Sequence, residues 1–192
     1  MQVNEILCAM RLETERLIIR PYKESDLLES YELMQDAELL TYMHMDVLPM
    51  EPYEELFQWL LASYGDRFEG PFKYSFPIIA KSSGEMVGWC GIGELDFSRP
   101  DKELYCLIRR SDWGRGYAGE AAAALAAYGF DTIGLDRLHA KADPRNAASL
   151  RVLEKLGFSF SHILEGLDGD DGNCNGERMH VLSKESFQGR RQ

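Results

Sequence analysis

The sequence has few cysteines, few histidines and no long apolar run, and each scarcity excludes a class of protein. Its four cysteines form no CxxC pair, so we expect no disulfide framework and a reducing, cytoplasmic compartment. The four histidines show no HxH or HxxxH spacing, so we expect no metal site. No apolar stretch approaches the ~20 residues of a spanning helix, and no signal peptide is recognisable, so we expect no membrane association.

Basic residues are also in the minority. Lysine and arginine total 21 against 32 aspartates and glutamates, which gives a formal net charge of −11. Nucleic acids and anionic membranes are bound by basic faces, so we expect neither as a partner. An acidic chain suits a cationic acceptor such as an amine. The length, the hydrophobic content of 45% and the lack of repeats or linkers predict a single domain over residues 1–192.

The periodicity of the apolar residues predicts strands and helices in a mixed order, with three consecutive strands as an antiparallel meander. This order indicates an α/β (α+β) fold, in which a mixed, mostly antiparallel sheet has helices on both faces. A polar turn, Asp168–Gly176, separates the last two strands. The predicted strands are Arg16–Arg20, Tyr74–Ala80, Met86–Leu95, Glu103–Arg109, Arg137–Ala142 and Glu177–Phe187, and the predicted helices are Ser25–Met34, Glu51–Tyr64, Glu120–Phe130 and Asn146–Gly157.

A glycine-bearing loop, Gly114–Gly119, runs directly into an alanine-rich helix. The first N–H groups of a helix are unpaired and carry partial positive charge, and small residues let a phosphate approach them. Arg109, Arg110 and Arg115 lie close by in the sequence, so the segment predicts a site for an anionic ligand. The loop also fits the letters GxGxxG, but a dinucleotide site needs a parallel βαβ unit around that motif. A helix that merely begins after a glycine-rich turn is the other interpretation.

Three segments, taken in order, resemble GNAT acetyltransferases. The segment Trp113–Ala118 resembles the family's pyrophosphate motif (Q/R)xxGx(G/A), with Trp113 in place of the usual Gln or Arg. The segment Asn146–Phe158 resembles the family's NxxSxxVLEKLGF helix. Glu15–Pro21 is similar to the first strand of the branch that contains the ribosomal-protein N-terminal acetyltransferases. The ordered set covers nearly the whole chain, so the resemblance implies a GNAT fold with acetyl-CoA as cosubstrate.

The resemblance also implies where acetyl-CoA binds. Backbone amides of the glycine loop hold the pyrophosphate, and the end of the preceding strand pairs with the pantetheine amides. An amide chain can pair with a strand edge in this way. The first turn of the next helix contacts the pantetheine arm. The implied cofactor-binding residues are Leu107, Ile108, Arg109, Arg110, Gly114, Arg115, Gly116, Ala118, Gly119, Asn146 and Ser149.

The implied reaction is direct attack of a primary amine, on a protein N-terminus or a small molecule, on the acetyl thioester. Glu103, at the start of its strand, is the candidate general base, and Glu94 on the neighbouring strand is the second candidate. Either could instead be a solvated carboxylate at a strand end. Ser149 could hydrogen-bond the thioester sulfur. The tyrosine that often protonates the leaving thiolate in this family is replaced by Leu153, so a non-catalytic CoA-binding sensor or scaffold is the alternative function.

Two further patterns have simpler interpretations. Asp171–Gly176 matches the first half of an EF-hand loop, but the twelfth position is Leu182, so we interpret the segment as a turn. Methionines and aromatics are frequent between Tyr42 and Tyr64. Helix packing explains them, with an acceptor pocket or a dimer surface as the alternatives. A homodimer is a partner suggested by the family resemblance.

Overall fold

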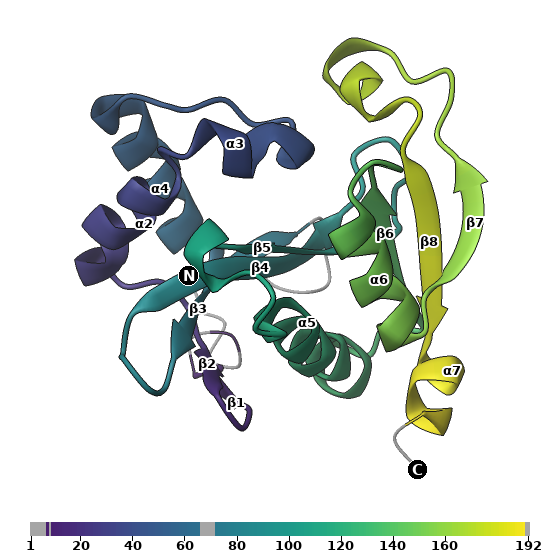
Figure 1. Ribbon diagram of the computed structural model, residues 1–192, viewed down its shortest axis with the longest axis horizontal. Coiled ribbons are helices and arrows are strands. Elements are labelled where there is room, and N and C mark those ends of the chain that lie inside the picture. Colours follow the sequence, from purple (N-terminus) through teal and green to yellow (C-terminus); the bar gives the residue numbers. More distant parts are fainter. Residues whose placement is uncertain (1–6, 8, 66–71, 191–192) are drawn as a thin grey trace.

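The computed structural model describes residues 7, 9–65 and 72–190, and this part of the chain forms one eight-stranded sheet between layers of helices (Figure 1). The strand order is β1-β2-β3-β4-β5-β6-β8-β7, and every neighbouring pair is antiparallel except β5 and β6. The predicted mixed, mostly antiparallel sheet is therefore confirmed. The strands are β1 (Leu12–Glu13), β2 (Leu17–Ile19), β3 (Lys73–Ala80), β4 (Met86–Glu94), β5 (Lys102–Ile108), β6 (Arg137–Ala142), β7 (Ser159–Ile163) and β8 (Arg178–Ser183).

Helices cover both faces of this sheet. In Figure 1, α2 and α4 lie on one side of the central strands, and α5 and α6 lie on the other. The central strand β4 is buried along its whole length, as expected for a strand between two helical layers. The helices are α2 (Leu27–Leu33), α3 (Ala37–Leu40), α4 (Met50–Ser63), α5 (Tyr117–Tyr128), α6 (Ala147–Leu156) and α7 (Lys184–Gly189), and the shorter helical turns are η1 (Glu24–Asp26), η2 (Thr41–Met43), η3 (Arg110–Asp112), η4 (Gly129–Ile133) and η5 (Gly169–Cys174).

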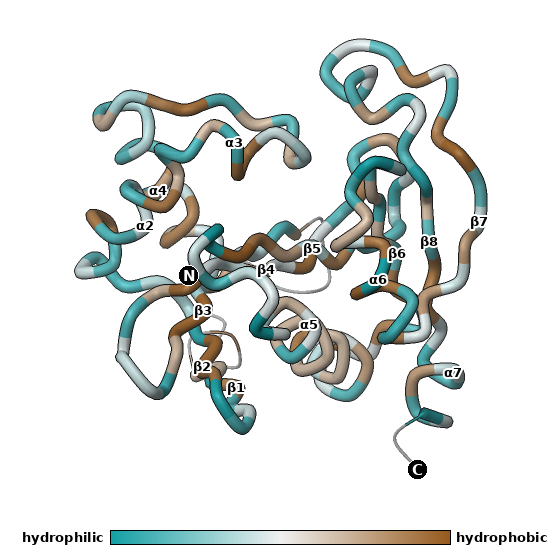
Figure 2. The backbone as a smooth tube through the Cα atoms, in the orientation of Figure 1, coloured by the Kyte–Doolittle hydropathy of each residue, from teal (hydrophilic) through white to brown (hydrophobic). Residues whose placement is uncertain are grey.

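The core lies between the sheet and these two layers. Figure 2 shows hydrophobic residues gathered along β5, while the outer turn between β7 and β8 is largely hydrophilic. On one face, aromatic side chains of α4 and β3, such as Phe57 and Phe76, are fully buried. On the other face, small residues of α5, such as Ala121 and Ala126, let that helix lie close to the sheet. The start of α5, which carries the predicted cofactor loop, is therefore held close to β4 and β5.

The hairpin of β1 and β2 fixes the beginning of α5. Glu120 of α5 accepts hydrogen bonds from the Thr14 hydroxyl at 2.5 Å and the Arg16 backbone N–H at 2.9 Å. The Arg16 guanidinium donates to the second Glu120 oxygen at 2.7 Å and to the Arg115 carbonyl at 2.7 Å, and it lies over the Tyr117 ring. The chain segment that resembles the family's first strand thus holds the glycine loop in place.

The structure departs from the sequence prediction at several places, among them the end of the last strand, the start of α5, the segment α3–η2, and the strands β1 and β7, whose ranges were not predicted. The last strand ends at Ser183 rather than Phe187, because the Ser183 hydroxyl caps α7 by accepting from the Ser186 N–H. Phe187 then packs against Phe130 with ring centroids 5.3 Å apart. Helix α5 begins at Tyr117, three residues before the predicted start. The segment α3–η2 was not predicted, since it is too short to show a helical period.

We predict that Gly88→Ala destabilises the fold through β5. A Cβ at Gly88 would lie 2.1 Å from the Leu107 carbonyl oxygen and 2.9 Å from the Ile108 Cα, so the backbone of β5 would have to move. Overpacking of this kind costs about 1–3 kcal/mol. For a chain of this size the melting temperature should fall by about 3–10 °C, which calorimetry can measure.

Gly189→Ala is the matched control for this substitution. A Cβ at Gly189 would meet no described atom within 4 Å, and this glycine ends a helix without a positive φ. Its melting temperature should therefore stay within about 2 °C of the unsubstituted protein. Equal stability of the Gly88→Ala and Gly189→Ala variants would show that β4 does not constrain β5 as described.

Candidate functional site

The strands β5 and β6 separate from one another and open the sheet. They are parallel neighbours, but their register pairs only Glu103 with His139, near the beginning of β5. Beyond this pair the two strands diverge (Figure 1). Because the carboxyl ends of parallel strands point the same way, the ends at Ile108 and Ala142 form the two sides of a gap in the sheet. Open sheets commonly bind ligands outside such strand ends.

The backbone of Ile108 faces this gap. The N–H of Arg109 donates to the Val87 carbonyl of β4 at 2.8 Å. Backbone groups of successive residues point to opposite sides of a strand, so the N–H and C=O of Ile108 point away from β4 and toward β6. The Ile108 carbonyl accepts the indole N–H of Trp113 at 2.6 Å. Trp113, which replaces the family's usual Gln or Arg, thus fixes the chain between β5 and the glycine loop.

The glycine loop ends in an uncapped helix N-terminus at the same side of the gap. Gly114 and Gly116 have φ angles of 77° and 82°, a backbone conformation that favours glycine. No side chain caps α5 at Gly116, and the Glu120 N–H is the donor to the Gly116 carbonyl at 3.2 Å. That bond is the first of the helix. The N–H groups of Tyr117, Ala118 and Gly119 come before it, so no carbonyl group within the helix accepts a hydrogen bond from them. They form a site that suits a phosphate.

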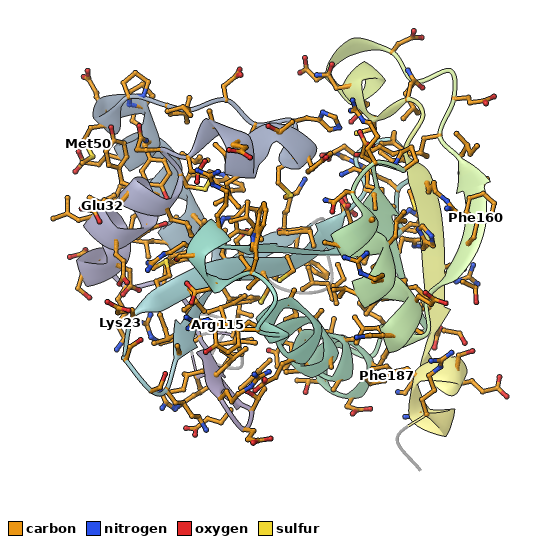
Figure 3. All side chains as sticks on the ribbon, in the orientation of Figure 1. Lys23, Glu32, Met50, Arg115, Phe160 and Phe187 are labelled. Atoms are coloured by element: carbon orange, nitrogen blue, oxygen red, sulfur yellow. The ribbon has the colours of Figure 1, made fainter. Side chains whose placement is uncertain are left out.

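The arginines near the loop are paired with acidic side chains. Arg109 lies 3.7 Å from a Glu29 oxygen, and Arg115 lies 3.2 Å from Asp112. Arg110 binds Asp36 at 2.6 Å and also contacts Glu38. The basic patch that the sequence suggested is therefore largely neutralised, and the backbone amides remain as the main feature for an anion. Arg115 itself is well exposed beside the start of α5 (Figure 3).

Helix α6 lies beyond the gap and is bounded by Asn146 and Gly157, which are the two ends of the predicted helix. The Asn146 side-chain oxygen accepts from the Ser149 N–H at 3.0 Å, and Gly157 ends the helix with a φ of 93°. Both Asn146 and Ser149 therefore sit in the first turn, close after the end of β6. Leu153, at the family's tyrosine position, is buried in the hydrophobic core.

A buried polar cluster lies along β5, β6 and the start of β8. Glu103 is 6% exposed, and one of its oxygens accepts from the Lys141 ammonium at 3.1 Å. Glu177 is 4% exposed, and its Oε1 lies 3.1 Å from His44 Nε2. Its other oxygen, Oε2, is buried without a hydrogen-bond partner among the described residues. Burial raises the pKa of Glu177, against the opposing influence of Lys141 and His44.

The turn η2 brings His44 to the end of β6. The pKa of Asp143, just after β6, is lowered mainly by its hydrogen bonds with Arg145 and also by the charge of His44. Tyr42 likewise contributes to the raised pKa of Arg145, after the larger effect of Asp143. The η2 turn therefore lies against the β6–α6 connection, at the side of the gap where the predicted residues Asn146 and Ser149 are found.

Glu94, the second predicted base, is engaged elsewhere. It is buried and bound by Lys102 at 2.9 Å and by Arg99 at 3.4 Å. Of the two carboxylates only Glu103 joins the cluster with Lys141 and Glu177. The sequence pointed to neither His44 nor Glu177, because the two lie 133 residues apart and share no motif.

Three donor atoms of this cluster are close enough together to raise the question of a metal ion. The donor atoms of His44, Cys174 and Glu177 lie within 4.8 Å of one another. The Lys141 ammonium acts electrostatically on both Cys174 and Glu177, which disfavours a second cation there. We assign no metal to the cluster. The half EF-hand segment forms the turn η5, with Asn175 hydrogen-bonded to Leu167, so the interpretation as a turn is confirmed.

Among the described residues, no helix has the length and apolar character needed to span a bilayer.

Comparison with known proteins assigns the family. The family model described as an acetyltransferase (GNAT) domain matches residues 16–159. An uncharacterized N-acetyltransferase of Bacillus licheniformis, p20, is 29% identical over 93% of this chain and 98% of its own length.

Solved structures show the same fold. A GNAT-family acetyltransferase from Bacillus anthracis has a TM-score of 0.76 with 24% identity, over 92% of this chain and 99% of that one. A spermidine N-acetyltransferase from Vibrio cholerae, solved with CoA and spermine, has a TM-score of 0.74 with 15% identity, over 91% of this chain and 99% of that one. The family model covers most of the chain, and the p20 relative aligns with nearly all of it. This chain therefore belongs to the GNAT family and is an acetyl-CoA-dependent N-acetyltransferase.

Proposed function

We propose that this enzyme transfers the acetyl group of acetyl-CoA to a primary amine by direct attack, the acceptor being a protein N-terminus or a small-molecule amine. The observation that carries the proposal is the gap between β5 and β6, which has backbone amides on one side and the buried carboxylates of Glu103 and Glu177 close by. Such a gap can hold a thioester between a polar backbone and a proton-accepting side chain.

The backbone would bind the cofactor. The amides of the glycine loop, from Gly114 through Gly116 to Gly119, would hold the pyrophosphate, since no side chain caps them. The strand end Leu107–Arg110 would pair with the pantetheine amides, because the Ile108 N–H faces the gap.

Side chains would handle the protons. The amine nitrogen attacks the carbonyl carbon, a C–N bond forms and the C–S bond breaks. The thiolate of CoA leaves and takes up the proton that the nitrogen loses as it becomes an amide, which gives free CoA thiol. The acceptor's ammonium must first lose a proton, and we propose Glu103 as the group that takes it, directly or through a water. Ser149, in the first turn of α6, would hydrogen-bond the departing sulfur. A thiol has a pKa of ~8.5, so it can leave without the tyrosine that Leu153 replaces.

Charge favours a cationic acceptor. The chain carries a net charge of −11, and the described cluster contains two buried carboxylates against one lysine. The structural relative from Vibrio cholerae acts on spermidine, a cationic amine. A peptide N-terminus has a pKa of ~8, against ~10.4 for a lysine-type amine, and is easier to deprotonate. Both kinds of amine therefore fit this proposal.

A non-catalytic CoA-binding sensor is the second candidate. The observation in its favour is Leu153, which is apolar and buried where the family often has a general acid. Such a protein would bind acetyl-CoA at the same amides and release no CoA thiol when amines are added.

We predict that Gly119→Asp weakens acetyl-CoA binding without unfolding the protein. A Cβ at Gly119 meets no described atom within 4 Å, and an acidic residue in the first turn of a helix is favourable. A carboxylate there would repel the pyrophosphate, and a loss of ~1.4 kcal/mol corresponds to a tenfold change. The KM for acetyl-CoA should rise about tenfold or more, while Gly119→Ser, which adds no charge, should stay within about threefold. Equal KM values for the two variants would place the pyrophosphate elsewhere.

A panel of acceptors tests the function itself. Release of free CoA thiol is measured with acetyl-CoA and either spermidine, an amino sugar, free amino acids or short peptides with a free N-terminus. We expect thiol release with one acceptor class, at least tenfold above the rate of hydrolysis without acceptor, because transfer needs a positioned amine. Binding of acetyl-CoA with no thiol release for any amine would favour the sensor.

A further inference from the structure

A cavity of about 310 Å³ lies on the sheet, and the proposed cofactor site does not use it. One wall comes from the connection between β4 and β5, which contributes Phe97 and Ser98. The opposite wall comes from the end of β7 and the residues after it, from Ser161 to Glu165. A cavity of this size is large enough for a small organic molecule.

Strand register places this cavity beside Glu103. His139 lines the cavity and is the register partner of Glu103 on the adjacent strand. Met179 also lines it and is the register partner of Lys141, which donates to the Glu103 carboxylate at 3.1 Å. Register partners on adjacent strands lie about 5 Å apart and point to the same face of the sheet. The cavity therefore lies on the face of the sheet that carries the Glu103 carboxylate, about one strand spacing away from it.

The proposed cofactor site lies in the other direction along β5. This strand runs from Lys102 to Ile108, so Glu103 is near its beginning and the proposed pantetheine contacts are at its end. Asp101, which lines the cavity, comes directly before the strand. Glu103 is therefore placed between the cavity and the strand end that would pair with pantetheine. A molecule in the cavity can present an amine to Glu103 without competing with the cofactor.

Much of the cavity wall is apolar. The apolar side chains in it belong to a small hydrophobic cluster that is separate from the main core. One of them is aromatic and one carries a thioether, and both groups make favourable contacts with aromatic rings. These side chains suit the apolar body of a ligand, and they are Leu95, Phe97, Leu164, Leu167 and Met179.

The charged groups in the cavity wall are acidic. Asp101 and Glu165 contribute carboxylates, and no lysine or arginine of the described ranges lines the cavity. The Ser98 hydroxyl donates to Asp101 Oδ2 at 2.9 Å, and the same oxygen lies 4.0 Å from His139 Nε2. A negative wall attracts a cation and repels an anion. The cavity therefore combines an apolar wall with a charge that is complementary to an ammonium group.

We propose that this cavity holds the body of the acceptor, and that the acceptor is a primary amine with an apolar, ring-sized substituent, such as 2-phenylethylamine. The ring contacts the apolar wall, the two carboxylates attract the ammonium group as it enters, and the amine lies at Glu103. An amino sugar would instead bury hydroxyl groups against that apolar wall, which is costly. This inference rests on the proposed function, because it takes Glu103 as the base and narrows the class of acceptor.

Two amines that differ only in the ring test the cavity. Thiol release from acetyl-CoA is measured with 2-phenylethylamine and with ethylamine. The kcat/KM for 2-phenylethylamine should be at least tenfold higher, because burial of a phenyl group contributes more than the ~1.4 kcal/mol that corresponds to a factor of ten. Equal values for the two amines would overturn the inference.

Ser161→Trp tests the place of binding. Ser161 is an exposed residue that lines the cavity, so an indole there can fill it without disturbing the core. The kcat/KM for 2-phenylethylamine should fall at least tenfold, while ethylamine and the KM for acetyl-CoA should stay within about threefold. Phe97→Ser, which removes part of the apolar wall, should lower the same kcat/KM and again spare ethylamine.

Ser159→Trp is the matched control. Ser159 is exposed on the same strand and is not part of the cavity wall, so all three kinetic values should stay within about threefold. An unchanged preference for 2-phenylethylamine in both Ser161→Trp and Phe97→Ser would overturn the cavity as the acceptor site. Thiol release with spermidine or a peptide but not with 2-phenylethylamine would overturn the inference and leave the proposed function intact. No thiol release with any amine would overturn both.

Discussion

The site depends on one constraint, the single pairing of β5 with β6 at Glu103 and His139. The two strands belong to two antiparallel groups, one made of β1 to β5 and the other of β6, β8 and β7. Each group is well paired internally, so the sheet opens where they meet. The gap exposes the Ile108 backbone at its open end and keeps Glu103 buried at its closed end. A cofactor that pairs with a strand edge can enter there without breaking any other strand pair.

Long-range contacts hold the parts of the site in place around this gap. The Arg16–Glu120 interaction fastens the glycine loop to the β1–β2 hairpin, and the Trp113 indole fastens the same loop to the end of β5. On the other side, the contact of His44 with Glu177 joins the η2 turn to the start of β8. Preorganised groups of this sort lower the cost of binding and of charge stabilisation. Because Arg109, Arg110 and Arg115 are paired with acidic side chains, the proposed binding of the cofactor relies mainly on backbone amides.

Local signals made much of this architecture predictable. The limits of α6 follow from the Asn146 cap and from Gly157, and β6 spans the predicted residues Arg137–Ala142. The fold class and the family followed from the order of motifs along the chain. By contrast, the end of β8 at Ser183 and the early start of α5 at Tyr117 depend on capping and on loop geometry that periodicity does not report. The proposed cofactor residues and the roles of Glu103 and Ser149 stay predictions.

Pairwise contacts between distant segments could not be predicted. The acids that neutralise Arg110 are Asp36, which caps α3, and Glu38 within α3, both more than seventy positions away. The His44–Glu177 pair joins two segments that are 133 residues apart. A single sequence contains no signal for such pairs. Spacing rules for histidine also cannot detect donor atoms that meet only in the folded chain, as those of His44, Cys174 and Glu177 do. Of the buried polar cluster formed by Glu103, Lys141, Glu177 and His44, the sequence therefore indicated only Glu103.

The most direct test of this account is thermal unfolding with acetyl-CoA, NAD or ATP added separately. A ligand present at ~100 times its Kd stabilises the folded state by ~2.7 kcal/mol. For a chain of this size that corresponds to a rise of about 5–10 °C in melting temperature. The account predicts this rise with acetyl-CoA and little change with NAD or ATP. No rise with acetyl-CoA, or a rise only with a nucleotide, would contradict the assignment of the gap and the glycine loop to acetyl-CoA.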